Sequence, residues 1–341
     1  MEIYDLYQAA RLGTLASVPG SLLTSTQLLV RNASGTTPLH LVARHGGLEH
    51  LPAEIFTEEN FLLRNDSGYT PLHLAAEGGH LDNLPRRLLV DRLLKQASNS
   101  GFTVYHVAAA YGHLDQIPSD LLTPEVVIST NYLGNNLLHE AAENGTLNRV
   151  PPRFLTHDFF LHPNVGGETV FHVAAFNGHL DQIPAGLLTP DTLLLTNVAG
   201  DTVLHAAAIA GYLEQVPAEL FTRENLALPS KSGFTAIHAA AESGQLAKIP
   251  REKLTADLLA TRNENGDTPL HAAAHEGHLD QVPLALLTEE NLNVRNFDGV
   301  SVARTAIDRG FAAQLPLAFR PITLSRMTRL LRRFGFSRRA N

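Results

Sequence analysis

The sequence predicts an all-α solenoid of stacked helix-turn-helix repeats, and three regular spacings carry this prediction. A histidine recurs every 33 residues, at His40, His73, His106, His139, His172, His205, His238 and His271. A glycine precedes each of these histidines by five residues, another glycine follows by six, and a proline follows by twelve. Self-similarity at a fixed period indicates a repeat architecture, in which each unit buries its apolar face against its neighbours.

The first half of each unit reads as a turn followed by a short helix. In Asn65-Asp66-Ser67-Gly68, polar residues before a glycine favour a tight turn with positive φ. The next residues are Thr70-Pro71-Leu72-His73, in which threonine is a good helix N-cap and proline suits the first helical position. The alanines after the histidine let neighbouring helices approach closely, and the second glycine ends the helix.

The second half of each unit is expected to hold two short helical pieces rather than one helix. A proline inside a helix would cost about 3 kcal/mol, so the proline that recurs in every unit must stand at a helix start. A threonine follows five residues later in most units, as in Thr57-Glu58-Glu59-Asn60, and gives a second cap signal with acids in the first turn. We therefore expect one piece to begin at each proline and another at each threonine.

These motifs resemble the ankyrin repeat family, whose fingerprint is Thr-Pro-Leu-His-x-Ala at a period of 33 residues. Thr70-Pro71-Leu72-His73 and Thr268-Pro269-Leu270-His271 match it directly, and the resemblance covers roughly residues 1–319. It implies an ankyrin-like solenoid with turn or β-hairpin fingers. It also implies that each repeat histidine bonds near its threonine and bridges to the next unit. The proline column departs from the family, whose outer helix is unbroken.

The repeat predicts four regions along the chain. Residues 1–31 lack the first turn and read as an amino-terminal capping repeat, and residues 32–295 hold eight full repeats. Residues 296–319 form a degenerate carboxy-terminal capping repeat, in which Arg304 replaces the histidine. Residues 320–341 are a basic, arginine-rich tail.

Composition narrows the class of protein. The chain has 341 residues, a formal net charge of −8 and no cysteine, which excludes disulfides and thiolate chemistry. No apolar run reaches the length of a transmembrane helix, and the first residues lack the pattern of a signal peptide. We expect a cytoplasmic protein, or one delivered into a host cell without a recognisable amino-terminal signal.

Charge is concentrated in the tail, which supports three hypotheses. From Arg309 to the end there are eight arginines and no acid, and Leu324, Met327, Leu331 and Phe334 recur at helical spacing. The tail could close the stack as a last outer helix, or bind an anionic membrane or an acidic partner through Arg326, Arg329, Arg332 and Arg333. Nucleic-acid binding is not expected, because the rest of the chain is acidic and would repel phosphate.

The histidines also raise a metal-dependent enzyme as an alternative. His271, His275 and His278 have the spacing i, i+4, i+7, which can hold zinc on one helix. However, two of the three belong to repeated columns, and Gly277 should end the helix before His278. We expect no catalytic residue, no metal and no cofactor, and therefore a non-enzymatic protein.

Large apolar residues stand at variable positions of the repeat that are not needed for its core. These positions lie four residues before the repeat histidine and four or five after it, where the family resemblance implies a concave face. They hold Tyr69, Phe102, Tyr111, Phe176, Ile209 and Phe234. Exposed aromatic residues rimmed by charge mark protein interfaces, although packing between repeats is the alternative. We expect a monomeric scaffold that binds another protein through this face.

Overall fold

The structure, a computed structural model, describes residues 5–321. The chain divides into two compact units, Met1–Ala206 and Ala207–Asn341. The division falls inside helix α13 (Val203–Ala210). Each unit repeats one motif, so the same local rules apply in both.

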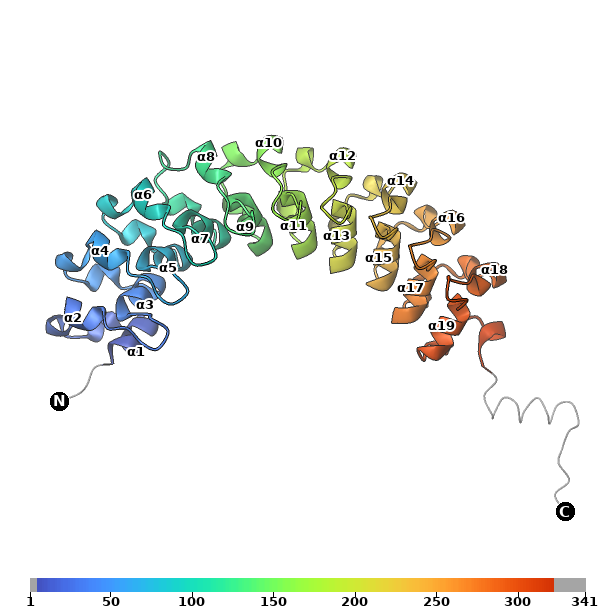
Figure 1. The fold of residues 1–341 in the computed structure, drawn as a ribbon, viewed down its shortest axis with the longest axis horizontal. Helices are drawn as coiled ribbons and strands as arrows, with labels where there is room; N and C mark the ends of the chain where they lie inside the picture. Colours follow the sequence, from blue (N-terminus) through green and yellow to red (C-terminus); the bar gives the residue numbers. More distant parts are fainter. Residues whose placement is uncertain (1–4, 322–341) are drawn as a thin grey trace, which may run out of the picture. The chain divides into compact units, whose positions relative to one another are not determined.

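In the first unit, one helix of each repeat lies in an inner row. These helices are α1 (Leu6–Arg11), α3 (Pro38–His45), α5 (Pro71–Gly78), α7 (Val104–Ala110), α9 (Leu137–Asn144) and α11 (Val170–Asn177). Each packs on the next in chain order, as the first half of Figure 1 shows. Sequential packing of this kind is that of a solenoid.

The second unit has the same inner row. Its helices are α15 (Ala236–Glu242), α17 (Pro269–Glu276) and α19 (Val302–Asp308), and they again pack in chain order. The prediction of an all-α solenoid is confirmed: the described residues contain helices and turns but no strand longer than an isolated bridge.

The outer layer consists of short pieces, as the proline and threonine columns predict. The α-helical pieces are α2 (Ser25–Leu28), α4 (Glu58–Phe61), α6 (Asp91–Leu94), α8 (Pro124–Val127), α10 (His157–Phe160), α12 (Pro190–Leu193), α14 (Arg223–Ala227), α16 (Ala256–Leu259) and α18 (Glu289–Asn293). Each follows a threonine, except α6, which follows Val90. In α4, Thr57 Oγ1 accepts from the Asn60 backbone N–H at 3.2 Å, so the threonine is a true cap.

The proline begins a one-turn 3₁₀ helix rather than an α-helix. These turns are Gly20–Leu22, Ala53–Ile55, Arg86–Leu88, Pro152–Phe154, Ala185–Leu187, Ala218–Leu220, Arg251–Lys253, Leu284–Leu286 and Leu317–Phe319. The prediction is wrong at Pro118, where only a hydrogen-bonded turn follows, with Leu121 N–H donating to the Pro118 carbonyl at 2.9 Å.

A third outer piece precedes each proline and was not expected. It is a 3₁₀ turn, at Leu15–Ser17, Leu48–His50, Leu81–Asn83, Leu114–Gln116, Leu147–Arg149, Leu180–Gln182, Leu213–Gln215, Leu246–Lys248, Leu279–Gln281 and Ala312–Gln314. It ends two residues before the proline, because the residue between them is forced out of the helical region. Leu51, before Pro52, is accordingly extended at φ −77° and ψ 142°.

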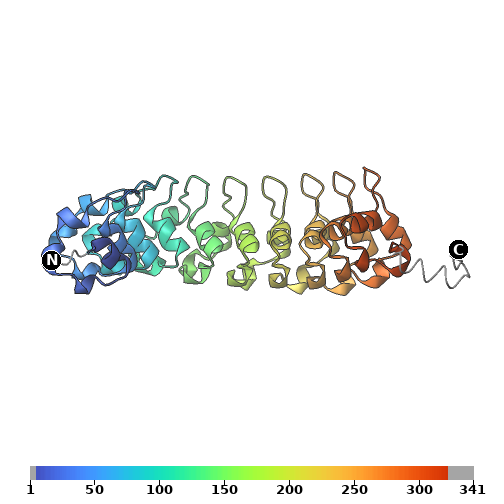
Figure 2. The same ribbon diagram turned by 90° about the horizontal axis from the view of Figure 1, so that it is seen from below.

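The loops that lead into the inner helices form fingers along one edge of each unit (Figure 2). An asparagine opens many of them, and in one finger Asn65 Oδ1 accepts the backbone N–H groups of Ser67 and Tyr69. Gly68 stands at φ 79°, as its place in the turn requires. Successive fingers are also joined, since Asp66 N–H donates to the Ser34 carbonyl at 3.0 Å.

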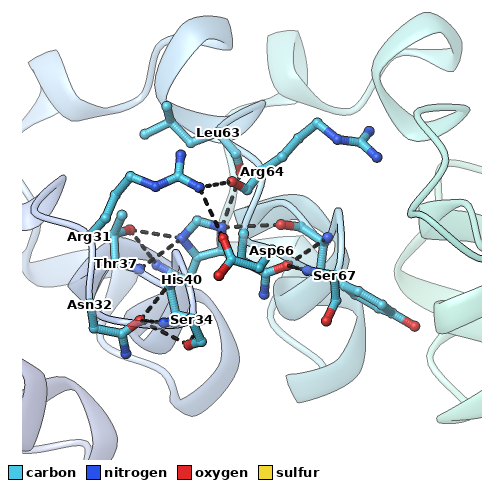
Figure 3. A network of polar contacts seen from close by, with 12 residues as sticks. Arg31, Asn32, Ser34, Thr37, His40, Leu63, Arg64, Asp66 and Ser67 are labelled. Atoms are coloured by element: carbon cyan, nitrogen blue, oxygen red, sulfur yellow. Dashed lines mark hydrogen bonds and ion pairs between the residues drawn. The ribbon is translucent and has the colours of Figure 1, made fainter.

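The repeat histidines bond each repeat to the following repeat, as the family resemblance implies. His40 is buried, and its Nδ1 lies 2.8 Å from Thr37 Oγ1 (Figure 3). Because Nδ1 also accepts the Thr37 backbone N–H, Nε2 carries the proton. Nε2 then donates to the carbonyl of Leu63, at the end of the same repeat, and to that of Tyr69 in the following repeat, at 3.1 and 3.2 Å. The histidine therefore satisfies backbone groups that would otherwise be buried without partners.

Candidate functional site

The variable positions of the repeat come together on one side of each unit, which we call the inner face. It comprises the residues four before and four or five after each repeat histidine. In the first unit a pocket joins such residues, Thr36, Arg44 and His45, to Gln8 of α1 and to Leu12, which follows that helix. In the second unit a pocket joins Phe234, Glu242, Asp267 and His275. The fingers and the inner helices thus supply a shared surface within each unit.

Three of the six predicted partner-binding residues are exposed. Tyr111 and Phe176 in the first unit are 50% and 53% exposed, and Ile209 in the second unit is 46% exposed. Surface rings of this size are what a protein partner could bury. The other three, Tyr69, Phe102 and Phe234, are half-buried.

The half-buried rings pack on the histidines of their own repeats. The ring centroids of Tyr69 and His73 are 5.2 Å apart, and those of Phe102 and His106 are 6.1 Å apart, both edge-on. Phe234 lies 5.3 Å from His238 in the second unit. These rings serve the packing around the histidine as well as the surface, so they are poorer candidates for partner contact than Tyr111 and Phe176.

Polar groups fix Tyr111 on the inner face. Arg44 and Glu77, in the two preceding repeats, form an ion pair of 2.5 Å. Burial, followed by the nearby Glu77 carboxylate, raises the pKa of Tyr111 above its usual range. The Tyr111 hydroxyl therefore stays protonated and able to donate a hydrogen bond. Side chains of three consecutive repeats meet here, so the Tyr111 ring lies beside the ion pair of Arg44 and Glu77.

Exposed apolar side chains at the finger tips escaped the sequence analysis. Tyr132, Leu133, Val165 and Val198 occupy the tips of three successive fingers of the first unit and are 60–74% exposed. The tips are joined through the backbone, because Val165 N–H donates to the Leu133 carbonyl at 3.0 Å. The sequence does indicate this surface. The column seven residues before the repeat histidine is polar at Asp66 and Asn99 but apolar or aromatic at Tyr132, Val165 and Val198.

A buried carboxyl group was also missed. Glu140 on α9 is 2% exposed, and its Oε1 accepts from the Nδ2 groups of Asn131 and Asn135 at 2.9 and 3.1 Å. Burial raises the pKa of Glu140 to about 7, the Asn135 hydrogen bond opposes this, and the charge of Glu143 adds to it. The corresponding residues of the neighbouring repeats, Val107 and Val173, are apolar. The repeat pattern therefore predicts an apolar residue at this position.

The histidine triplet does not form a metal site. Helix α17 ends at Glu276, and Gly277 follows in a left-handed conformation at φ 81°, so His278 lies off the helix. Its Nδ1 is 3.3 Å from the Ala241 carbonyl of the preceding repeat. Within residues 5–321, no three His, Cys, Asp or Glu residues are grouped to hold an ion.

The tail residues Arg326, Arg329, Arg332 and Arg333 lie outside the described residues. Between residues 5 and 321, no helix is both long and apolar enough to cross a bilayer.

Comparison with known families agrees with the repeat geometry. A model of three consecutive ankyrin repeats matches residues 6–85 and 57–119, and a model of a single ankyrin repeat matches residues 265–297. The matched residues are ankyrin repeats, and the rest of the repeated array shares their 33-residue period. A search of curated proteins gives no match. Ankyrin repeats are generally scaffolds for protein–protein interaction.

The repeat of α9, which lies between the matched regions, keeps the bond from its histidine to the next repeat. In the repeat of α9, Asn136 replaces the usual threonine, and its Oδ1 accepts the backbone N–H groups of Leu138 and His139 at 3.0 and 3.1 Å. His139 Nε2 then donates to the Glu168 carbonyl of the next repeat at 3.0 Å. The helix cap and the histidine bond to the next repeat are therefore both kept when asparagine replaces threonine.

Proposed function

We propose that this ankyrin-repeat protein is a non-enzymatic scaffold that binds another protein through the inner face of its first unit. The observation that carries this proposal is the exposure of Tyr111 and Phe176, at 50% and 53%, on helices whose every repeat is tied to the next. A rigid surface loses little conformational entropy when it binds. The polar support from Arg44 and Glu77 supplies the charged rim that protein interfaces commonly have.

Affinity capture with the full chain tests this proposal. The bait is wild type, Phe176→Ala, or Leu284→Ala, and bound proteins are compared by mass spectrometry. Leu284 is the matched control because it is 76% exposed but stands in an outer 3₁₀ turn. A true partner is lost with Phe176→Ala and retained with Leu284→Ala. Capture that is equal for all three baits would contradict the proposal.

A basic adaptor is the second candidate, and it rests on the tail sequence. Residues 322–341 contain six arginines and no acid. Sedimentation with vesicles of phosphatidylserine and phosphatidylcholine separates the two candidates. An adaptor loses vesicle binding when Arg326, Arg329, Arg332 and Arg333 are changed to glutamine, and its binding weakens with salt. A scaffold that binds only through the inner face should not sediment with the vesicles, whether or not these arginines are changed.

A further inference from the structure

A pocket of about 300 Å³ opens on the inner face of the second unit. Its walls come from three consecutive repeats: Phe234 and Asp267 from the fingers, Glu242 from α15, His275 and Glu276 from α17, and Thr305 from α19. The volume is at the lower end of small-ligand sites. It suits one side chain rather than a whole cofactor.

The pocket carries carboxylates that the protein itself leaves largely uncompensated. Glu242 is exposed and forms no ion pair within residues 5–321. Asp267 accepts only the neutral Asn296 amide, at 2.8 Å from Nδ2 to Oδ1. Glu276 Oε1 lies 2.5 Å from His275 Nδ1. Three carboxyl groups thus line a space that has no lysine or arginine among its lining residues.

Two arginines of these repeats, Arg262 and Arg304, bond to groups other than the carboxylates of the pocket. Arg262 Nη1 donates to the carbonyls of Gly266 and Arg295, at 2.8 and 2.9 Å. Arg304 pairs with Asp308 on the same helix at 2.7 Å. Arg309 reaches the His275 wall, with Nη2 3.1 Å from His275 Nδ1, which leaves Glu242 and Asp267 without an arginine partner within residues 5–321. The pocket therefore keeps a negative potential in which a cation from outside would be favoured.

One wall of the pocket is aromatic. The Phe234 ring is half-buried and lines the space together with Ala272. An aromatic face attracts a cation placed over it, and an apolar wall accepts the methylene stem of a long basic side chain. A wall of this kind beside carboxylates on two repeats fits a guanidinium group, because its planar fork can donate to several oxygens at once.

We propose that this pocket binds an arginine side chain presented by a partner polypeptide. The inference rests on the proposed scaffold function and names the chemistry of one subsite. Glu242 and Asp267 accept the guanidinium hydrogen bonds, and Phe234 packs against the side chain. No bond is made or broken, so the pocket selects and orients a partner.

The test measures binding of short blocked peptides to the full chain. The probe is acetyl-Gly-Arg-Gly-amide, and the neutral control is the same peptide with citrulline, which keeps the shape but not the charge. Binding is followed by chemical shifts of isotope-labelled protein at low salt. The expected dissociation constant for arginine is on the order of millimolar, and citrulline should bind about tenfold more weakly or worse.

Two variants locate the site. Glu242→Gln should weaken binding of the arginine peptide about fivefold or more. Glu219→Gln is the matched control, because Glu219 is exposed on an outer 3₁₀ turn of the same unit, and it should leave binding unchanged. Both positions are exposed, so both variants should fold, which their melting curves verify.

Equal binding of arginine and citrulline, or binding indifferent to Glu242→Gln, would overturn the proposal. Arginine binding that emerges only after removal of residues 322–341 would assign the pocket to the chain's own basic tail, and would contradict an external ligand. None of these results changes capture through Phe176 in the first unit. A failed pocket is therefore distinguishable from a failed scaffold.

Discussion

The buried histidines govern how stability depends on pH. Burial lowers the pKa of four of them to about 4, while hydrogen bonds to backbone carbonyls partly oppose the shift. They are His40, His73, His106 and His139. In the unfolded chain a histidine titrates near 6.5. Between these values the unfolded state binds more protons than the folded state, so stability falls as the pH drops.

We predict that the free energy of unfolding decreases steadily from pH 7.5 to pH 5. Each such histidine should remove about 2 kcal/mol at pH 5. Urea unfolding followed by circular dichroism measures this. The variant His73→Gln should flatten the profile, whereas His50→Gln, on an exposed outer turn, should not. A stability that stays constant down to pH 5 would contradict the neutral, buried state of these histidines.

Glu140 has the opposite effect on how stability depends on pH. Its pKa of about 7 in the fold lies above the ordinary value of 4.5. The folded state therefore holds the extra proton, and the associated stability is complete below about pH 4.5 and lost as the pH rises through 7. Above pH 7 a charged carboxylate is buried among amides. One carboxyl group of this kind is outweighed by the several buried histidines below pH 6.5.

We predict that Glu140→Gln stabilises the protein at pH 8, by roughly 1–3 kcal/mol. Glutamine keeps an acceptor for Asn131 and Asn135 but cannot ionise. At pH 5 the advantage should vanish, because Glu140 is then protonated. Thermal melts at both values measure the difference, with Asp115→Asn, on an exposed outer turn, as the control. A Glu140→Gln variant that is less stable than wild type at pH 8 would refute the raised pKa.

Single residues show where sequence reasoning stops. The threonine–histidine bond was expected from the family fingerprint because it recurs in register. Glu140 and its asparagine partners occur in one repeat only, and their partnership depends on a three-dimensional arrangement that spacing does not reveal. Tyr132 and Val165 were missed for a related reason: the same column is polar in other repeats, so it read as a solvated turn.

At the scale of elements, the outer layer was predictable in outline. Proline fixes φ and forbids a helix interior, so a break at each proline followed from the sequence alone. Whether the resulting piece is α or 3₁₀ did not follow, because three residues are too few to show a period. The extra 3₁₀ turn before the proline was missed for the same reason.

The threonine caps allow a reciprocal test. Helix α6 follows Val90 and has no side-chain cap, whereas Thr57 caps α4. Installing the hydroxyl by Val90→Thr should stabilise the protein by about 0.5–1 kcal/mol, and Thr57→Val should destabilise it by about 1 kcal/mol. The two changes are near-isosteric, so equal effects of the same sign in urea unfolding would show that packing, not capping, decides these helix starts.

At the scale of the molecule, consecutive repeats within each unit bond to one another. In the first unit His113 Nδ1 lies 2.8 Å from the Ala76 carbonyl, and Gln116 Nε2 donates to the Gly79 carbonyl at 2.8 Å. In the second unit Ser243 Oγ donates to the Ala208 carbonyl. Stability of such arrays comes from neighbour contacts. Variable surface residues are therefore free to serve binding.

We propose above all that Phe176 is a binding residue and not a core residue. Isothermal titration calorimetry of the full chain with the partner retained in the capture experiment tests it most directly, together with a melting curve of the same variant. Phe176→Ala should lower affinity by about 2 kcal/mol or more and change stability by only about 0.5 kcal/mol. A large loss of stability with unchanged affinity would contradict the account.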